Sequence, residues 1–221
     1  MKAFADRDEA GLLLGQALAG LDPAPGPGAL VLGIPRGGVI VAAAAARVLG
    51  ADLDVMVPAK IRAPHQPELA IGAVGPDGGV WLDAAAVAAL AIPEEVLDAQ
   101  VRAAWQEVLR RTAAFRGDRP PPSVTGRFVV LVDDGIATGA TIAAAARALR
   151  AQAPGRLVVA VPVAPGQGVR QLATEVDQVV CLASPEPFLA VGQWYQDFRQ
   201  VGDDAVQQAL SATGSKPNES L

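Results

Sequence analysis

The stretch "RFVVLVDDGIATGAT", Arg127–Thr141, decides which fold we expect for this chain. Its apolar run suits a buried strand, and the run ends in two adjacent acids, Asp133 and Asp134. A short loop of Gly, Thr and Ala follows and leads into a predicted helix. Successive backbone amides in such a loop, together with the positive end of the helix, suit an anion. Two carboxylates beside an anion site leave three interpretations open, which are a metal site, a phosphate site and a plain turn.

Apolar strand candidates alternate with helical segments along the chain. The strand candidates cover residues 30–34, 52–61, 128–132, 156–163 and 178–183, and the helix candidates cover 6–19, 39–49, 93–116, the segment after 141, and 166–176. This alternation predicts an α/β fold, a doubly wound parallel sheet of about five strands. We expect one domain over residues 1–210 and a flexible tail over 211–221. In such sheets, ligands bind beyond the carboxyl ends of the strands.

The composition argues against several classes of protein. The chain has 221 residues, of which 51% are hydrophobic, and its formal net charge is −5. The acidic balance disfavours general binding of nucleic acid. The longest apolar stretches fall short of the roughly 20 residues that span a bilayer, and the N-terminus lacks the apolar core of a signal peptide. Cys181 is the only cysteine, and no Cys/His spacing suits zinc. We therefore expect a cytoplasmic protein with no membrane and no nucleic-acid partner.

The two acids and the anion loop are compatible if they bind different groups of one ligand. The carboxylates accept hydrogen bonds from a vicinal diol, while the loop holds a phosphate one sugar away. Gly135 and Gly139 allow the backbone to approach a ligand closely, and Thr138 and Thr141 add hydroxyl donors. No Lys follows Gly139, so the loop is not a Walker loop. A ribose 5-phosphate is a ligand that fits both halves.

An apolar strand, two acids and a TGxT loop in this order resemble the signature of type I phosphoribosyltransferases, which use phosphoribosyl pyrophosphate (PRPP). The resemblance implies that Asp133 and Asp134 hold the ribose 2- and 3-hydroxyls as catalytic residues. It also implies Mg²⁺ as the cofactor, bound near the same acids through ribose hydroxyls or water. The loop that would bind the 5-phosphate consists of Gly135, Ala137, Thr138, Gly139, Ala140 and Thr141. The competing interpretation is a solvated Asp-Asp-Gly turn before a helix.

"GIPRGG", Gly33–Gly38, is a second Gly-rich turn after a predicted strand. In the family that the chain resembles, the loop after the first core strand binds pyrophosphate through backbone amides and often has an unusual peptide geometry. The resemblance therefore assigns the pyrophosphate to Pro35, Arg36, Gly37 and Gly38, with Arg36 as a catalytic cation. The alternative is an arginine in an ordinary Gly-rich surface turn.

Lys60 and Arg62 are expected to close the next strand, where a cation balances the charge of pyrophosphate. The resemblance makes Lys60 a catalytic residue, and an ordinary solvated side chain is the alternative for either one. Residues 61–80 hold three prolines and four glycines, so we expect a long mobile loop or a hairpin. The resemblance implies that residues 63–80 match the mobile loop that covers the site in this family. His65 and Glu68 lie within it, and both an acid/base role and simple exposure are open for them.

The segment "SPEPFLAVGQWYQDFRQV", 184–201, collects aromatic residues near the C-terminus. Purine-salvage members of the family close the base pocket with a similar stretch, so we expect a small hood from residues near 1–25 and 184–210. Phe188, Trp194 and Tyr195 are candidates to stack on a base, and Asp197 is a candidate to read its edge. The alternative is that these aromatics dock the C-terminal segment onto the core.

One position departs from the hypoxanthine-guanine type of the family. That type carries Asp at this position. This chain has Ala137 there, and adenine-type members of the family also have Ala. The pieces "GIPRGG", "ELAIGAV" and "VDDGIATGAT" are most similar to an uncharacterised bacterial-type group of predicted phosphoribosyltransferases, for which no acceptor is implied. We expect Mg²⁺-dependent transfer of phosphoribose from PRPP to an unidentified acceptor base or amine, by a homodimer.

A non-catalytic regulator of the same fold, which binds PRPP or a nucleotide, is the main alternative. Regulators with this fold usually need a surface for DNA or RNA, and the acidic chain offers no basic helix for one. A dinucleotide-dependent oxidoreductase also suits the α/β pattern. It is disfavoured because no G-x-G-x-x-G follows a predicted strand.

Overall fold

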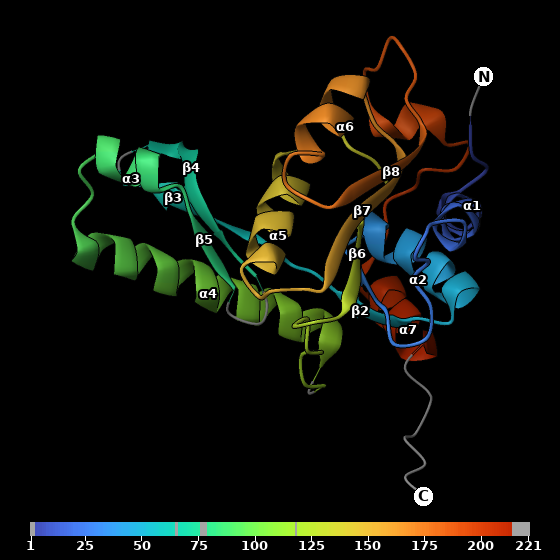
Figure 1. The fold of residues 1–221 in the computed structure, drawn as a ribbon, viewed down its shortest axis with the longest axis horizontal. Helices are drawn as coiled ribbons and strands as arrows, with labels where there is room; N and C mark the ends of the chain where they lie inside the picture. The colour runs from blue at the N-terminus through green and yellow to red at the C-terminus, as the bar shows by residue number, and fades with distance from the viewer. Residues whose placement is uncertain (1–2, 65, 76–78, 118, 214–221) are drawn as a thin grey trace, which may run out of the picture.

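The computed structural model describes residues 3–64, 66–75, 79–117 and 119–213. Its core is a five-stranded parallel sheet in the order β2-β1-β6-β7-β8 (Figure 1). The five strands are β1 (Leu30–Gly33), β2 (Asp52–Val55), β6 (Phe128–Val132), β7 (Arg156–Val163) and β8 (Gln178–Ala183). The predicted α/β fold with about five parallel strands is therefore confirmed.

Helices cover both faces of this sheet because its central strands are apolar on both sides. The neighbours Val130 and Leu131 of β6 are both fully buried and face opposite layers. Helices α1 (Arg7–Ala19) and α2 (Gly37–Leu49) pack on the Val130 face. Helices α5 (Ala140–Arg150) and α6 (Gly166–Leu172) pack on the Leu131 face.

The strand order reverses between β1 and β6. From β1 the chain adds β2 on one side, and β6, β7 and β8 follow on the other side. At such a point the loops after two adjacent strands diverge and leave a crevice at the carboxyl edge of the sheet. Residues 34–36 join β1 to α2, and residues 133–139 join β6 to α5. The two Gly-rich turns of the sequence therefore border the crevice.

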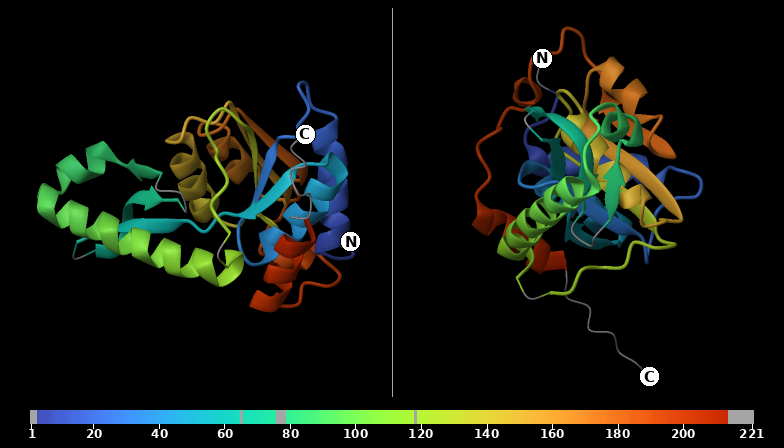
Figure 2. Two further views of the ribbon diagram at one scale, coloured as in Figure 1. Left: turned by 90° about the horizontal axis from the view of Figure 1, so that it is seen from below. Right: turned by 90° about the vertical axis from the view of Figure 1, so that its left-hand side faces the viewer.

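A second sheet, antiparallel and three-stranded, projects from the core with two helices (Figure 1, at the left). We call these five elements the arm. They are β3 (Ala59–Ala63), β4 (Gln66–Val74), β5 (Val80–Leu82), α3 (Ala84–Ala89) and α4 (Glu94–Arg116). Figure 2 shows that the long helix α4 runs from the far end of the arm back to the core. The inner ends of the arm strands lie beside α5.

The arm corrects two expectations drawn from the sequence. Residues 52–61 are not one strand, because β2 ends at Val55 and Lys60 lies on β3 of the second sheet. Within 61–80, β3, β4 and β5 form antiparallel pairs, so the hairpin interpretation holds and the long-loop interpretation is wrong. The fully buried side chains of Ile61, Ile71 and Val74 explain this, since they build an apolar face that outweighs the Pro and Gly content.

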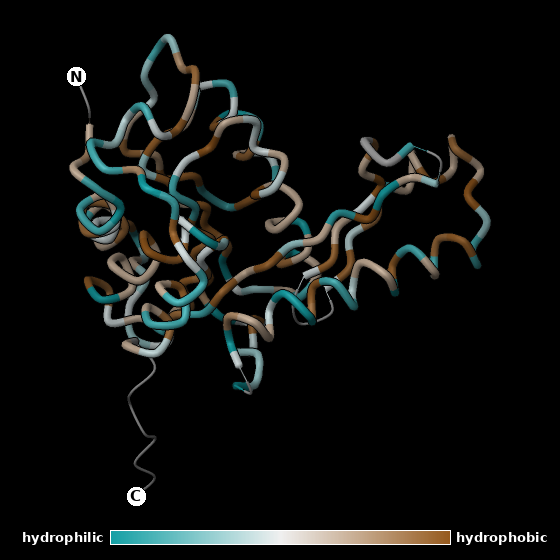
Figure 3. The backbone as a smooth tube through the Cα atoms, turned by 180° about the vertical axis from the view of Figure 1, so that it is seen from behind, coloured by the Kyte–Doolittle hydropathy of each residue, from teal (hydrophilic) through white to brown (hydrophobic). Residues whose placement is uncertain are grey.

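α4 joins the arm to the core through its C-terminal half. Figure 3 shows hydrophobic and hydrophilic residues alternating along this helix, and its buried residues Val108, Thr112, Phe115 and Arg116 all lie in the last half. Arg116 forms a buried ion pair with Asp54 of β2 at 2.9 Å, with 6% and 10% of the two side chains exposed. A buried charge is costly unless it is paired, so this contact fixes where α4 meets the sheet.

The N- and C-terminal segments meet beside the core sheet. Phe4 forms an isolated parallel bridge with Tyr195, and α7 (Asp203–Thr213) packs on α2 and α4. Residues 211–213 of the expected flexible tail belong to α7, and the remainder, 214–221, lies outside the described residues, so the tail stays a prediction. Within the described ranges, the structure contains no helix that is both long and apolar enough to cross a membrane.

Candidate functional site

The two Gly-rich turns pack directly on one another at the carboxyl ends of β1 and β6. A Cβ atom on Gly37 would overlap Oδ2 of Asp134, and a Cβ atom on Gly38 would lie only 2.8 Å from Cα of Asp133. Neither position has room for a side chain, so glycine is required there by the close approach. The fold thus brings together two motifs that are far apart in the sequence.

The two acids of the second turn differ in their partners. Nε of Arg7 donates to Oδ2 of Asp134 at 2.8 Å, and only 11% of the Arg7 side chain and 17% of the Asp134 side chain are exposed. Asp133 forms no ion pair within the described part of the chain, and its Oδ1 accepts the backbone amide of Asp134 at 2.9 Å. Asp134 is therefore held in place, while Asp133 keeps a carboxylate oxygen for a ligand.

Burial changes the acidity of both carboxyl groups. Loss of hydration raises the pKa of Asp133 well above its ordinary value, and the neighbouring charge of Asp134 adds to the effect. Loss of hydration also raises the pKa of Asp134, whereas the hydrogen bond and charge of Arg7 oppose that rise. Raised pKa values of this kind are common where a site is built to receive hydrogen-bond donors or a cation.

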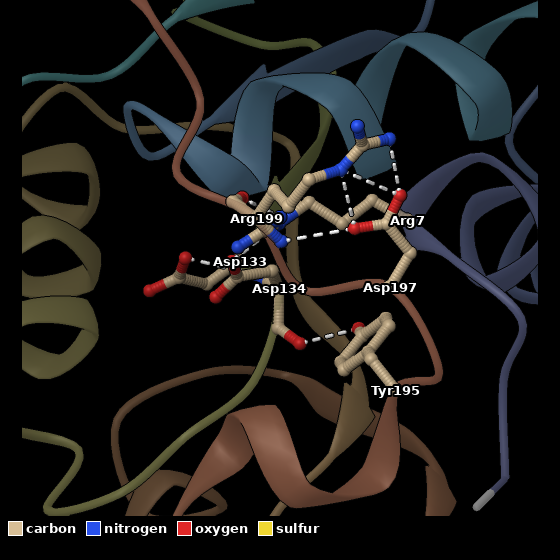
Figure 4. A network of polar contacts seen from close by, with 6 residues as sticks. All are labelled: Arg7, Asp133, Asp134, Tyr195, Asp197 and Arg199. Atoms are coloured by element: carbon tan, nitrogen blue, oxygen red, sulfur yellow. Dashed lines mark hydrogen bonds and ion pairs between the residues drawn. The ribbon is translucent and has the colours of Figure 1, made fainter.

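Arg7 belongs to a network that links the two terminal segments to the acid pair (Figure 4). Its guanidinium carbon lies 3.9 Å from the centre of the Phe198 ring, and Nη1 donates to the carbonyl oxygen of Arg199 at 2.9 Å. The Arg199 side chain pairs with Asp197, and its hydrogen bonds lower the pKa of that carboxyl. The N-terminal helix and the C-terminal segment therefore jointly fix the position of the Asp134 side chain.

The aromatic residues expected to form a hood over a base share one apolar cluster with Phe4, but their exposure differs. Tyr195 has no exposed surface, and its hydroxyl donates to the carbonyl of Asp134 at 2.6 Å. It therefore packs the C-terminal segment onto the core and offers no ring face to a base. The Asp197 carboxylate is taken up by the ion pair described above. Phe188 and Trp194 stack on one another with ring centres 6.3 Å apart.

The loop after β6 places the start of α5 beside the crevice. Gly139 is the N-cap and has a φ of 77°, a left-handed conformation that favours glycine. The first amides of a helix have no partner inside the helix, so the start of α5 presents donors suited to an anion. Ala137, Thr138 and Thr141 are exposed. Gly135 packs against Val191, and a Cβ there would overlap that side chain.

The turn after β1 contains a cis peptide bond between Pro35 and Arg36. An unusual peptide geometry was expected at this turn, and the structure has one. The Arg36 side chain turns toward α7, where its Nε lies 2.8 Å from Oδ1 of Asp203. About half of each side chain is exposed, so this pair is weak and open to exchange with another anion.

A cavity of about 600 Å³ opens between the turn after β1, the start of α5 and the arm, and we call it the crevice cavity. Pro35 and Thr141 line it from the core, and Lys60 and Arg62 line it from β3. Arg111 of α4 adds a third cation, and Glu107 of the same helix adds one acid. The lining is rich in cations on the side of the arm, and such a lining suits a ligand with several negative charges.

Sequence reasoning missed Arg7 and Arg111. Arg7 lies 127 residues before its partner Asp134, Arg111 lies on a helix about 50 residues after Lys60, and neither is in a recognisable motif. The adjacent pair Arg110–Arg111 on an otherwise amphipathic helix was the one available signal for α4. His65 lies outside the described residues, and so does the side chain of Glu68.

The carboxylates present fit a metal ion that arrives with a phosphorylated ligand. Among the described residues no three His, Cys, Asp or Glu side chains cluster closely enough to hold a metal by themselves. Mg²⁺ usually binds through one or two carboxylates and completes its shell with substrate phosphates and water. Asp133, without an ion-pair partner in the described ranges, suits that arrangement better than Asp134, whose carboxylate Arg7 already engages.

The chain is similar to a protein family, to curated proteins and to a solved structure. The family model described as "Phosphoribosyl transferase domain" matches residues 22–188. Two curated proteins from strains of Mycobacterium tuberculosis, both named "Putative phosphoribosyl transferase", are 47% identical over 206 residues, which is 93% of this chain and 46% of each relative. This chain therefore spans about half the length of those relatives. The crystal structure of TT1426 from Thermus thermophilus is 42% identical, with 95% of this chain and 98% of that chain covered and a TM-score of 0.84.

Proposed function

This chain belongs to the phosphoribosyl transferase domain family, and from that premise we propose that it transfers the 5-phosphoribosyl group of PRPP to a nitrogen acceptor and releases pyrophosphate. One observation carries the proposal. The glycine turn after β1 packs on the acid pair after β6, and the crevice cavity with its three cations is lined by Pro35 of that turn and by Thr141 at the start of α5. This arrangement offers places for a diol, a monophosphate and a pyrophosphate within one crevice.

Each part of PRPP has residues to receive it in this proposal. The start of α5, with Thr138, Gly139 and Thr141, holds the 5-phosphate through backbone amides and hydroxyl groups. Asp133 and Asp134 accept hydrogen bonds from the ribose hydroxyls. The turn Pro35–Gly38 donates backbone amides to the pyrophosphate from the core side. Lys60, Arg62 and Arg111 neutralise the pyrophosphate from the arm side.

The residues act on the bond between C1 and the pyrophosphate oxygen. The acceptor nitrogen donates its lone pair to C1, and the C1–O bond breaks with its electron pair going to pyrophosphate. The three cations of the crevice cavity stabilise the negative charge that grows on the leaving group. A Mg²⁺ ion bound with PRPP would supply further positive charge, and Asp133 is the carboxylate placed to hold it, directly or through water.

The arm gives the site a wall in place of the loop expected from the sequence. Its strand β3 and helix α4 face the core turns across the crevice cavity. A wall of this kind limits the access of water, which competes with the acceptor for C1. We propose that the arm does this as a preformed structure, because its strands and helix are joined through their own apolar cluster.

The main competing function is a regulator that binds PRPP without turnover. Release of pyrophosphate, measured with PRPP, Mg²⁺ and a panel of purines, pyrimidines and small amines, separates the two. Our proposal expects release that depends on at least one acceptor and that falls by about a hundredfold or more in Lys60→Ala, the loss typical of removing a charged group that stabilises a leaving group. A regulator would bind PRPP and release no pyrophosphate with any member of the panel.

A further inference from the structure

The Arg36 side chain, expected from the sequence to act on pyrophosphate, does not line the crevice cavity. Pro35 lines that cavity, whereas Arg36 and Gly37 line a neighbouring cavity of about 630 Å³. We call this space the α7 cavity, because it lies between the turn after β1, α4 and the segment that leads into α7. Pro35 and Arg111 line both cavities, so the two adjoin at the turn. The Arg36 guanidinium therefore lies next to the proposed pyrophosphate site and outside it.

An acid in the first turn of α7 holds Arg36 in this position. Nε of Arg36 lies 2.8 Å from Oδ1 of Asp203, and about half of each side chain is exposed. Asp203 lines the α7 cavity, and the next residue, Asp204, does not. Arg36 thus has an anionic partner within the chain itself. Because water reaches both side chains, the pair is weak enough for Arg36 to exchange this partner for another anion.

The position of the Asp203 carboxylate is fixed by the packing of α7. Val206 and Leu210 are fully buried in an apolar cluster that joins α7 to α2 and α4. Nε2 of Gln207 also donates to the carbonyl oxygen of Ala114 at 2.7 Å. The acid is therefore carried by a docked helix, whereas the cation is carried by a long, half-exposed side chain with several rotatable bonds. Rotation of the Arg36 side chain is enough to exchange its partner.

The strengths of the two contacts decide which partner Arg36 prefers. An exposed ion pair shifts an equilibrium by about one- to fivefold. A charge-assisted hydrogen bond from a guanidinium to a phosphate oxygen shifts it by roughly 10- to 150-fold. Bound pyrophosphate therefore outcompetes Asp203 for the guanidinium. The competition still weakens the binding of pyrophosphate by a small factor, because the ion pair must first be broken.

We propose that Asp203 is a positioning residue that competes with pyrophosphate for the Arg36 guanidinium. This inference rests on the proposed transfer function and adds a control on how the product leaves. When PRPP binds, the Arg36 side chain turns from the α7 cavity toward the pyrophosphate group. After transfer, Asp203 takes the guanidinium back, so the free pyrophosphate loses one of its cations and dissociates faster. The C-terminal helix thus favours release of the product.

Asp203→Asn removes the competing charge and nearly preserves the size of the side chain. Calorimetric titration with pyrophosphate and Mg²⁺ should show binding about two- to fivefold tighter than in wild type, and pyrophosphate should inhibit the transfer reaction at correspondingly lower concentration. Asp204→Asn is the matched control, because it removes the same charge from the same helical turn, and its Kd should stay within about 1.5-fold of wild type. Asp203→Glu, which restores the charge, should return the Kd toward the wild-type value.

The Arg36→Gln background separates the proposed competition from a structural effect. Asp203→Asn should change the Kd for pyrophosphate in wild type and leave it unchanged in Arg36→Gln, since the acid acts only through the guanidinium. An unchanged or weaker affinity in Asp203→Asn, an equal gain in Asp204→Asn, or a gain that persists in Arg36→Gln would overturn the proposal. The titrations need no turnover. A protein that binds pyrophosphate and releases none from PRPP with any acceptor therefore refutes the transfer function alone, whereas no binding of pyrophosphate at about 10 mM refutes both.

Discussion

Asp133 and Asp134 are neighbours in the chain and yet occupy different electrostatic environments. Asp134 is held twice, since Arg7 pairs with its carboxylate and Tyr195 donates to its carbonyl. Asp133 has no ion pair in the described structure, and burial raises its pKa well above the ordinary value. We infer that Asp134 serves mainly as a fixed orienting group. Asp133 is the carboxylate whose charge state responds to a ligand.

Asp133→Asn should stabilise the ligand-free protein while weakening PRPP binding. A carboxyl with a raised folded pKa binds its proton more readily when folded, so its ionisation lowers stability as the pH rises from its ordinary value of 3.8 through the folded value. Asn avoids this loss. Calorimetry should show a higher Tm at pH 8, with about 2–4 °C for each kcal/mol, and a gain that shrinks toward zero below about pH 4. A lower Tm than wild type at pH 8 would contradict the assigned acidity.

Arg7→Ala should make PRPP binding more sensitive to acid. Arg7 opposes the rise in the pKa of Asp134, so its loss raises that pKa further and a larger fraction of the carboxyl is protonated at pH 6. Titration with Mg²⁺-PRPP should therefore show a larger ratio of Kd at pH 6 to Kd at pH 8 than wild type. Arg47→Ala is the control, because Arg47 pairs with Asp8 on the exposed surface and such pairs contribute about 0–1 kcal/mol. An Arg7→Ala ratio equal to that of wild type would refute this role.

The acid pair could be found from the sequence, and its partner Arg7 could not. Asp133 and Asp134 follow an apolar run and precede a Gly-Thr loop, so the local pattern contains the information. Arg7 reaches Asp134 only because α1 packs on α2 and the C-terminal segment crosses beside it. The sequence leaves stacking on a base and docking onto the core both open for Tyr195, because aromatic content does not distinguish a buried ring from an exposed one.

At the scale of the element, helix α4 decides how the arm meets the core. Its period and its acidic first turn predict a helix over residues 93–116, and the structure has α4 over Glu94–Arg116. The hairpin before α4 is harder to predict. Its Pro and Gly residues mask the alternation of apolar and polar side chains along the strands, and a bulge near Arg62 interrupts that alternation. The placement of Lys60 on the second sheet follows from tertiary pairing, which no local pattern encodes.

Arg116→Ala should destabilise the protein strongly because it leaves Asp54 buried without its partner. Removing one member of a buried pair typically costs about 3–5 kcal/mol, and urea unfolding should show a loss of that size. Replacing both residues together, as Asp54→Leu with Arg116→Met, should recover much of the loss because no unpaired charge remains. If the double variant is no more stable than Arg116→Ala, the pair is not what anchors α4.

Arg111→Ala should weaken PRPP binding without unfolding the arm. Arg111 is exposed, lines the crevice cavity and has no ion pair in the described ranges, so its loss removes a charge-assisted contact of about 1.5–3 kcal/mol, or roughly 10- to 150-fold in Kd. Arg102→Ala on the same helix removes equal charge away from the cavity and should leave Kd within about twofold. Equal effects of the two variants would mean that only the overall charge of α4 matters.

At the scale of the whole molecule, the fold brings three distant parts of the chain to one crevice. The core sheet supplies the two turns, the arm supplies the cations and the terminal segments hold Asp134. Fold class was predictable because apolar strands alternate with helices throughout the chain. A homodimer and a cytoplasmic location stay predictions, and light scattering of the purified protein checks the first. The division into a hood and a core also stays a prediction.

The most direct test of the account is calorimetric titration of the protein with Mg²⁺-PRPP and, separately, with inorganic phosphate. We expect saturable binding of Mg²⁺-PRPP below about 1 mM. In the double variant Asp133→Asn, Asp134→Asn, binding of Mg²⁺-PRPP should weaken by about tenfold or more. Binding of phosphate, which we propose to contact the start of α5, should change little. Absence of Mg²⁺-PRPP binding at millimolar concentration, or equal losses for the two ligands, would contradict the assignment of the acid pair to the ribose of PRPP.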